Sequence, residues 1–175
     1  RLDRACTGGD GIRNLSEEER KAAINAHASA AADGRFSKFV PASGAASRMF
    51  KSLLALHGEE RELNRASLEQ RAQEGDPDAA FGLTFFQNLE KFAFFPQLAD
   101  ALQDAGQDIN SLMEAGQYRD ILSALLTEYG LNLAKLPKGL ISFHRMGDDL
   151  RTPVAEHFLE AHETVKSAEN DARLH

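Results

Sequence analysis

The residues best suited to chemistry lie in residues 38–51, where a short apolar run is followed by small side chains and then by Arg48. The pair Phe39–Val40 precedes the small residues 42–47, and Met49 begins an amphipathic helical pattern. This order predicts a strand, a tight turn and a helix whose first backbone N–H groups are unsatisfied. A helix start of this kind, with small side chains and a nearby guanidinium, is a natural phosphate-binding site.

A second stretch that could contribute a cation is the loop Leu136–Leu140, whose centre reads Pro-Lys-Gly. The loop leads into an apolar segment that ends at Phe143, and this pattern predicts a short strand. The two loops are the strongest chemical candidates in the chain.

Other chemistries are disfavoured by residue spacing. Neither a Gly-x4-Gly-Lys-Ser/Thr phosphate loop nor a Gly-x-Gly-x-x-Gly dinucleotide fingerprint occurs in the sequence. Ser43 precedes Gly44 as in a nucleophile elbow, but Pro41 stands where that motif has its first glycine, which disfavours a serine hydrolase. His157 and His162 are five residues apart and no cysteine cluster exists, so a metal site built wholly from this chain is not expected.

Together the two loops resemble the motifs of the nucleotidyltransferase superfamily, of which the sugar-phosphate pyrophosphorylases are well-known members. Those enzymes carry a loop of the form Leu-Ala-Ala-Gly-x-Gly-Thr-Arg-Met, followed by a Pro-Lys-x-Leu segment. The matching positions in this chain are Gly44, Ser47, Arg48 and Met49 in the first motif, Pro137 and Lys138 in the second, and Arg151–Phe158 in the helix start that commonly follows.

The resemblance implies a role for each matched position. Backbone N–H groups of the first loop would hold the phosphates of a nucleoside triphosphate, Arg48 would bind the β- and γ-phosphates, and Lys138 would approach the α-phosphate or the incoming phosphate. Mg²⁺ is implied as well, with its carboxylate ligands expected beyond His175. The implied catalytic residues are therefore Arg48 and Lys138, and the implied phosphate-binding residues are Ala42, Ser43, Gly44, Ala45, Ala46 and Ser47.

A closer resemblance covers most of the chain. The segments Phe39–Lys51, Leu136–Gly139, Arg151-Thr152 and Glu156-His157 are similar to a family of uncharacterised bacterial proteins described only as a domain of unknown function. Its members run to several hundred residues, so the resemblance implies that this chain is an N-terminal part of a longer protein. It implies a fold but no activity.

The composition limits the classes of function. The 175 residues suffice for one well-buried domain, and the formal net charge of −7 argues against non-specific binding to nucleic acid. A single cysteine, Cys6, excludes an internal disulfide and favours a reducing compartment. No apolar run approaches the length of a membrane span, and no signal-peptide pattern occurs. We therefore expect a cytoplasmic protein.

Helix signals account for much of the remaining chain. Ser16 and Glu19 form a capping-box pattern before an alanine-rich helix that ends at Asp33-Gly34. Residues 58–130 show helical periodicity and no strand pattern, and six phenylalanines within 81–95 are spaced as the core of a helical subdomain. Asp78 is predicted to cap the helix that contains Phe81 and Phe85. A last helix is predicted with Thr152 as its N-cap and Pro153 as its first residue.

These observations predict an α/β fold: a nucleotidyltransferase-like, Rossmann-type sheet made helix-rich by a large helical insertion and a missing C-terminal part. The predicted domains are 1–57, with the first strand, loop and helix of the core, 58–135, the insertion, and 136–175, the return to the core. The predicted function is transfer of a nucleotidyl group from a nucleoside triphosphate to a phosphorylated small molecule such as a sugar phosphate. The alternatives are a non-catalytic nucleotide-binding or protein-interaction module and a purely helical scaffold.

Overall fold

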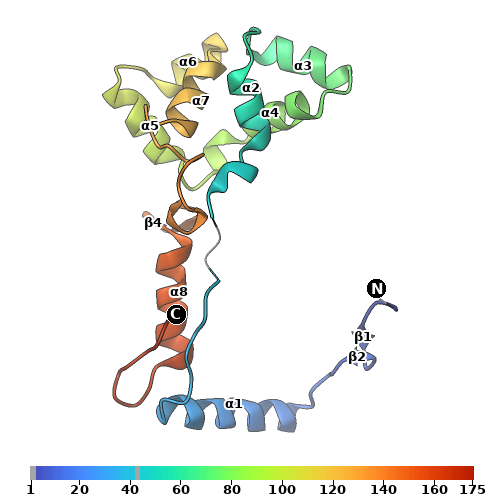
Figure 1. Ribbon diagram of the computed structural model, residues 1–175, viewed down its shortest axis with the longest axis vertical. Helices are drawn as coiled ribbons and strands as arrows, with labels where there is room; N and C mark the ends of the chain where they lie inside the picture. The colour runs from blue at the N-terminus through green and yellow to red at the C-terminus, as the bar shows by residue number, and fades with distance from the viewer. Residues whose placement is uncertain (1–2, 42–43) are drawn as a thin grey trace. The chain divides into compact units, whose positions relative to one another are not determined.

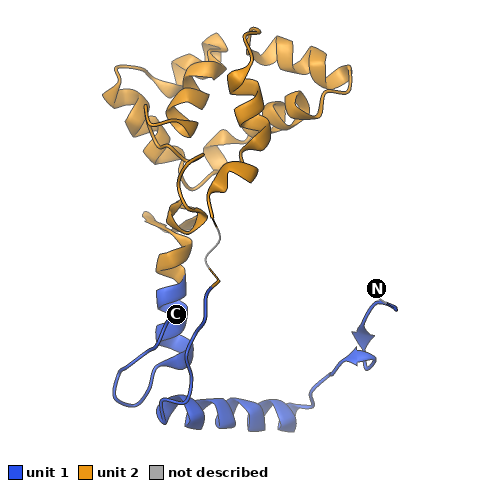
Figure 2. Cartoon of the chain, in the orientation of Figure 1, with its two compact units in different colours: residues 1–40, 157–175 blue, residues 41–156 orange. Residues whose placement is uncertain are grey.

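The computed structural model describes residues 3–41 and 44–175 of the chain (Figure 1). It divides them into two compact units: unit 1 holds residues 1–40 and 157–175, and unit 2 holds residues 41–156 (Figure 2). Helices dominate both units, and the described strands form two small sheets of two strands each. None of the described helices is both long and apolar enough to cross a membrane.

The elements follow in chain order. They are β1 (Thr7–Gly8), β2 (Gly11–Ile12), α1 (Glu17–Ala32), η1 (Ala46–Arg48), α2 (Lys51–Gly58), α3 (Arg65–Gln73), α4 (Pro77–Gln87), η2 (Leu89–Lys91), α5 (Phe95–Asp104), α6 (Ile109–Ala115), α7 (Tyr118–Leu126), η3 (Lys138–Leu140), β3 (His144–Met146), β4 (Asp149–Arg151) and α8 (Pro153–Val165).

The long helix of unit 1, α1, begins at the predicted capping box. The backbone N–H of Glu19 donates to Ser16 Oγ at 3.2 Å, and the Ser16 N–H donates to Glu19 Oε2 at 2.9 Å. The helix ends at Asp33, and Gly34 follows with φ of +65°, a conformation that glycine adopts without steric cost. The prediction for this helix is confirmed.

Unit 1 also contains a short parallel pairing between residues 38–40 and 173–175. Lys38 N donates to Arg173 O at 2.8 Å, His175 N to Lys38 O at 2.8 Å, and Val40 N to His175 O at 2.7 Å. The Lys38 side chain forms an ion pair with Glu160 of α8. At the strand predicted at Phe39–Val40, the structure has only an isolated parallel bridge between Lys38 and Leu174.

The hydrophobic core lies in unit 2, where α2 to α7 pack together. Gly82 of α4 permits a close approach to α2, since a Cβ there would lie 2.5 Å from Leu56 Cδ1. Phe86 stacks on Tyr118 with ring centroids 3.9 Å apart. Phe85, Phe86 and Phe94 are buried, whereas Phe81 and Phe92 are exposed. The predicted helical array is confirmed, and half of its phenylalanine cluster is buried core.

Two local predictions are wrong. The N-cap of α4 is Asp76, whose side chain accepts from Asp78 N and Ala79 N at 2.9 and 3.2 Å, and Pro77 occupies the first turn. The apolar segment after Lys138 is no strand, because residues 138–140 form the 3₁₀ turn η3 and Ile141 is buried in the core. The strands lie further on, as the antiparallel hairpin β3–β4.

The last helix, α8, begins as predicted. Ala155 N donates to Thr152 Oγ1 at 3.2 Å, and Pro153 is its first residue. The fold is therefore mixed and helix-rich, α/β in the general sense. In the described residues the extended Rossmann-type sheet is not seen. The predicted insertion, 58–135, lies wholly within unit 2 together with α2 and residues 136–156.

Candidate functional site

The first predicted loop adopts a tight turn before α2. Ala45 is extended, with φ of −56° and ψ of 152°, and residues 46–48 form the 3₁₀ turn η1. The backbone N–H of Met49 donates to Ala46 O at 2.8 Å, and α2 begins only at Lys51. The helix therefore starts two residues later than its apolar pattern indicates. Ala42 and Ser43, two predicted phosphate-binding residues, lie outside the described residues.

This loop meets the second predicted loop directly. Ala46 N donates to Leu136 O at 3.1 Å, and Ala45 forms an antiparallel bridge with Pro137. Ala46 is fully buried in the core of unit 2, as is Ile141 just beyond the second loop. The helical core thus fixes both loops, although about ninety residues separate them in the sequence.

The second loop is shaped by a close contact with α8. Leu140 N donates to Pro137 O at 2.9 Å, which closes the turn that carries Lys138. A Cβ on Gly139 would lie 3.0 Å from Val154 Cγ2, so a larger side chain would push against the first turn of α8. The absence of a side chain at Gly139 therefore lets the turn pack against this helix.

The two loops enclose a pocket of about 490 Å³, lined by Gly44, Ala45, Ser47, Arg48, Met49 and Lys138. Ser47 and Arg48 are exposed, and Lys138 is half-buried. The described lining contains two cations and no carboxylate. Neither the guanidinium of Arg48 nor the ammonium group of Lys138 forms an ion pair or hydrogen bond with another described residue. Two uncompensated positive charges at one small pocket favour an anionic ligand.

One part of the predicted phosphate cradle is wrong. The N–H of Ala46 already donates to Leu136 O, so it is not available to a phosphate. No hydrogen bond from the Ser47 N–H to a described residue occurs in this turn, whereas the Arg48 N–H lies within the 3₁₀ hydrogen bonding of η1. Ala46 has an ordinary negative φ, so the alanine at this position causes no backbone strain. The turn leaves Ser47, rather than Ala46, as a backbone donor.

The described lining of the pocket has no acidic side chain for Mg²⁺. No Asp, Glu or His lines it among the described residues, and the described chain contains no group of three such side chains placed to hold a metal ion. Glu156 of the third matched segment forms an ion pair with Arg151 at 3.5 Å and does not line the pocket. The described lining therefore supplies no acidic ligand for the implied Mg²⁺, whose carboxylate ligands the resemblance places beyond His175.

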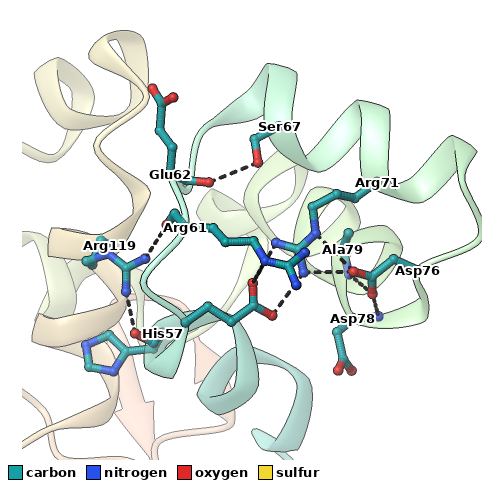
Figure 3. Close-up of polar contacts among 10 residues, drawn as sticks. His57, Arg61, Glu62, Ser67, Arg71, Asp76, Asp78, Ala79 and Arg119 are labelled. Atoms are coloured by element: carbon teal, nitrogen blue, oxygen red, sulfur yellow. Dashed lines mark hydrogen bonds and ion pairs between the residues drawn. The ribbon is translucent and has the colours of Figure 1, made fainter.

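A polar network that the sequence did not indicate joins α2, α3, α4 and α7 (Figure 3). Arg71, largely buried, donates from Nη2 to Asp76 Oδ2 at 2.7 Å and to Glu59 Oε1 at 3.0 Å. The Arg71 hydrogen bond and the N–H donors of Ala79 and Asp78 lower the pKa of Asp76. The network ties the end of α3 to the start of α4, which is a structural role.

The left part of Figure 3 shows the polar contacts at the end of α2. Arg119 of α7 donates to the carbonyl of His57 and, at 2.7 Å, to that of Arg61. Ser123 Oγ donates to Arg119 O at 3.0 Å, so at 2.9 Å from His57 Nε2 it accepts the imidazole proton. Burial, with a smaller contribution from Arg119, lowers the pKa of His57. Because the serine hydroxyl donates its proton to a backbone carbonyl, His57 does not act as a base toward Ser123 in this arrangement.

Comparison with known proteins adds a family and no activity. Residues 1–175 match the family described as Domain of unknown function (DUF4301). No curated protein and no solved structure matches the chain. The match agrees with the resemblance to a domain of unknown function and does not bear on the nucleotidyltransferase motifs or on a bacterial origin. With the matched region spanning every residue of the sequence, the chain belongs to the DUF4301 family.

Proposed function

We propose that the pocket between η1 and η3 binds the phosphates of a nucleoside triphosphate and supports transfer of its nucleotidyl group to a phosphorylated small molecule such as a sugar phosphate. One observation carries this proposal. Arg48 and Lys138, chosen from two distant motifs, line the same pocket, which has no carboxylate among its described residues. A pocket with this charge suits a polyanion.

In the proposed reaction an oxygen of the acceptor's phosphate attacks the α-phosphorus of the nucleotide. The bond from the α-phosphorus to the acceptor oxygen forms as the bond to the β-phosphate oxygen breaks, and pyrophosphate leaves. Arg48 stabilises the charge that grows on the leaving pyrophosphate, because a guanidinium can donate two hydrogen bonds to one phosphate. Lys138 holds the α-phosphate or the incoming phosphate. No step is assigned to a metal, since the described lining of the pocket has no acidic side chain for it.

The strand pairing within unit 1 supports a larger α/β architecture for the chain. Residues 38–40 pair in parallel with residues 173–175, and α8 lies between the two segments in the sequence. A strand, a helix and a parallel strand form the βαβ unit of nucleotide-binding sheets. We infer that the two segments are neighbouring strands of a nucleotidyltransferase-like, Rossmann-type sheet in a cytoplasmic protein.

Calorimetric titration of the intact protein with each common nucleoside triphosphate, with and without Mg²⁺, tests the binding step. We expect saturable binding of one of them. A coupled assay for pyrophosphate with sugar 1-phosphates as acceptors then tests the transfer. Absence of binding to every triphosphate by folded protein would contradict the proposal.

A second candidate is nucleotide binding without catalysis, and it is favoured because the described lining supplies two cations and no acidic residue. Nucleotidyl transfer ordinarily relies on carboxylate-bound metal to stabilise the phosphates. Binding of a triphosphate without release of pyrophosphate, for any acceptor tried, would support this candidate over the enzyme.

A further inference from the structure

A second groove lies in unit 2, between one face of α5 and residues 131–142. Its volume is about 400 Å³. The α5 side consists of Gln97, Asp100, Ala101 and Asp104, which follow one another at the three- and four-residue spacing of a single helix face. The groove therefore runs along about two turns of this helix.

The opposite side of the groove is apolar. Leu133 and Ile141 are 4% and 1% exposed and anchor this wall in the core, while Leu140 is 53% exposed at the rim. Leu136 and Leu140 also flank Lys138, so whatever fills the groove would contact the turn that carries this residue. An apolar wall with an exposed leucine at its rim suits the apolar face of another helix.

The α5 wall carries negative charge that nothing in the described chain neutralises. Asp100 and Asp104 are exposed and lie one helical turn apart, and their carboxylates form no ion pair or hydrogen bond with a described residue. Like charges at this spacing repel each other within a helix. A cation placed between them would relieve that repulsion.

We propose that this groove docks an amphipathic helix of a partner protein, with leucine-like side chains against the apolar wall and Lys or Arg side chains beside Asp100 and Asp104. The length of the groove along α5 suits a helix, which presents apolar and charged residues at a matching period. A second copy of this chain is the poorer occupant, because its 27 acidic residues outnumber its 20 basic ones. The proposal is independent of the nucleotide pocket.

A labelled probe peptide tests the docking on the intact protein. The probe is a helical peptide of about 15 residues built from Leu and Lys at helical spacing, since shorter isolated helices are only marginally stable in water. The control peptide carries Glu in place of every Lys. We expect saturable binding of the Lys peptide by fluorescence anisotropy and none of the Glu peptide. Amide shifts in the NMR spectrum should then be confined to α5 and residues 131–142.

Matched variants separate the groove from general attraction to an acidic protein. We expect Asp100→Asn with Asp104→Asn, and separately Leu140→Ser, to weaken binding about fivefold or more. The control is Glu60→Gln with Glu128→Gln, which removes the same charge from exposed residues elsewhere in unit 2 and should leave binding unchanged. All four positions in these two charge variants are exposed, so folding should be preserved.

Three results would overturn the proposal. The Lys peptide could fail to bind the folded intact protein. It could also bind the groove variants as tightly as it binds the Glu60→Gln, Glu128→Gln control variant. Alternatively, sedimentation could detect a dimer that Leu140→Ser converts to monomer, in which case a second copy occupies the groove.

Discussion

Arg48 and Lys138 form the residue pair on which the proposed activity depends. Each should contribute a charge-assisted interaction with phosphate, so Arg48→Ala and Lys138→Ala should each weaken triphosphate binding by about tenfold or more. Neither residue pairs with a described side chain, so the melting temperature should change little. Titration calorimetry and thermal unfolding of the same samples measure both effects.

Two nearby cations provide the controls for this prediction. Lys135 and Arg145 are exposed, lie in unit 2, and do not line the pocket. Lys135→Ala and Arg145→Ala should leave triphosphate affinity unchanged. Equal losses in all four variants would indicate non-specific attraction between the anion and surface cations, and loss of folding in Arg48→Ala and Lys138→Ala would make these residues structural.

His57 gives the chain a stability that depends on pH. Burial and Arg119 lower its pKa in the folded protein below the ordinary value of 6.5. The unfolded chain therefore binds the proton more tightly, and the free energy of unfolding must fall as the pH drops from above 6.5 through the folded pKa. Urea unfolding across this range should show the fall, and His57→Asn should reduce its slope. An unchanged slope in the variant would assign the fall to other groups.

At the scale of elements, the ion pair between Arg71 and Asp76 connects the end of α3 to the start of α4. Removal of the guanidinium in Arg71→Met leaves Asp76 without its cation, and leaves Glu59 with only the exposed Arg61, at 4.0 Å. We expect a loss of about 1–3 kcal/mol in the free energy of unfolding, from the unpaired polar groups. Denaturant titration measures it.

Asp76→Asn and Asp76→Ala separate the charge from the cap at this junction. Asparagine is a good N-cap and can still accept from Ala79 N, whereas alanine loses the cap at a cost of about 0.5–2 kcal/mol. Because its folded pKa is lowered, Asp76 contributes stability above the ordinary value of 3.8 that is lost as the pH falls below it. Equal stability of the two variants would contradict a capping role.

Elements with strong local signals were the ones that sequence alone could predict. Ser16 with Glu19 and Thr152 with Pro153 identify the starts of α1 and α8, because a cap depends on residues within one turn. The hairpin β3–β4 has only three residues in each strand and no alternating apolar pattern, so its sequence carries no periodic signal that would predict a strand.

In the candidate site, too, local motifs were predictable from the sequence and contacts between distant segments were not. The motifs identified Arg48 and Lys138 as a pair, and the structure has both at one pocket. The Ala46–Leu136 hydrogen bond could not be foreseen, because it depends on how the helical core folds between two distant loops. The Arg119 contacts with His57 and Arg61 likewise join residues about sixty positions apart, and no local pattern encodes them.

At the scale of the whole molecule, the two units differ in how much they bury. The hydrophobic core cluster belongs entirely to unit 2, whereas the buried side chains described in unit 1 are Ala31 and Ala161. An alanine-rich helix of this length is only marginally stable without tertiary packing. Stability in unit 1 therefore has to come mainly from local hydrogen bonds and caps.

This contrast predicts a gradient in hydrogen exchange across the 175-residue chain. Amides of α7, where Ile121, Leu122 and Leu125 are fully buried, should exchange only through global unfolding. Amides of α1 should exchange through local opening, about a hundredfold or more faster. Mass spectrometry of peptides from the two helices measures the difference, and denaturant well below the unfolding midpoint should accelerate α7 far more steeply. Equal protection of α1 and α7 would mean that unit 1 unfolds only together with the core of unit 2, and the division of the chain into two units would then lose its thermodynamic meaning.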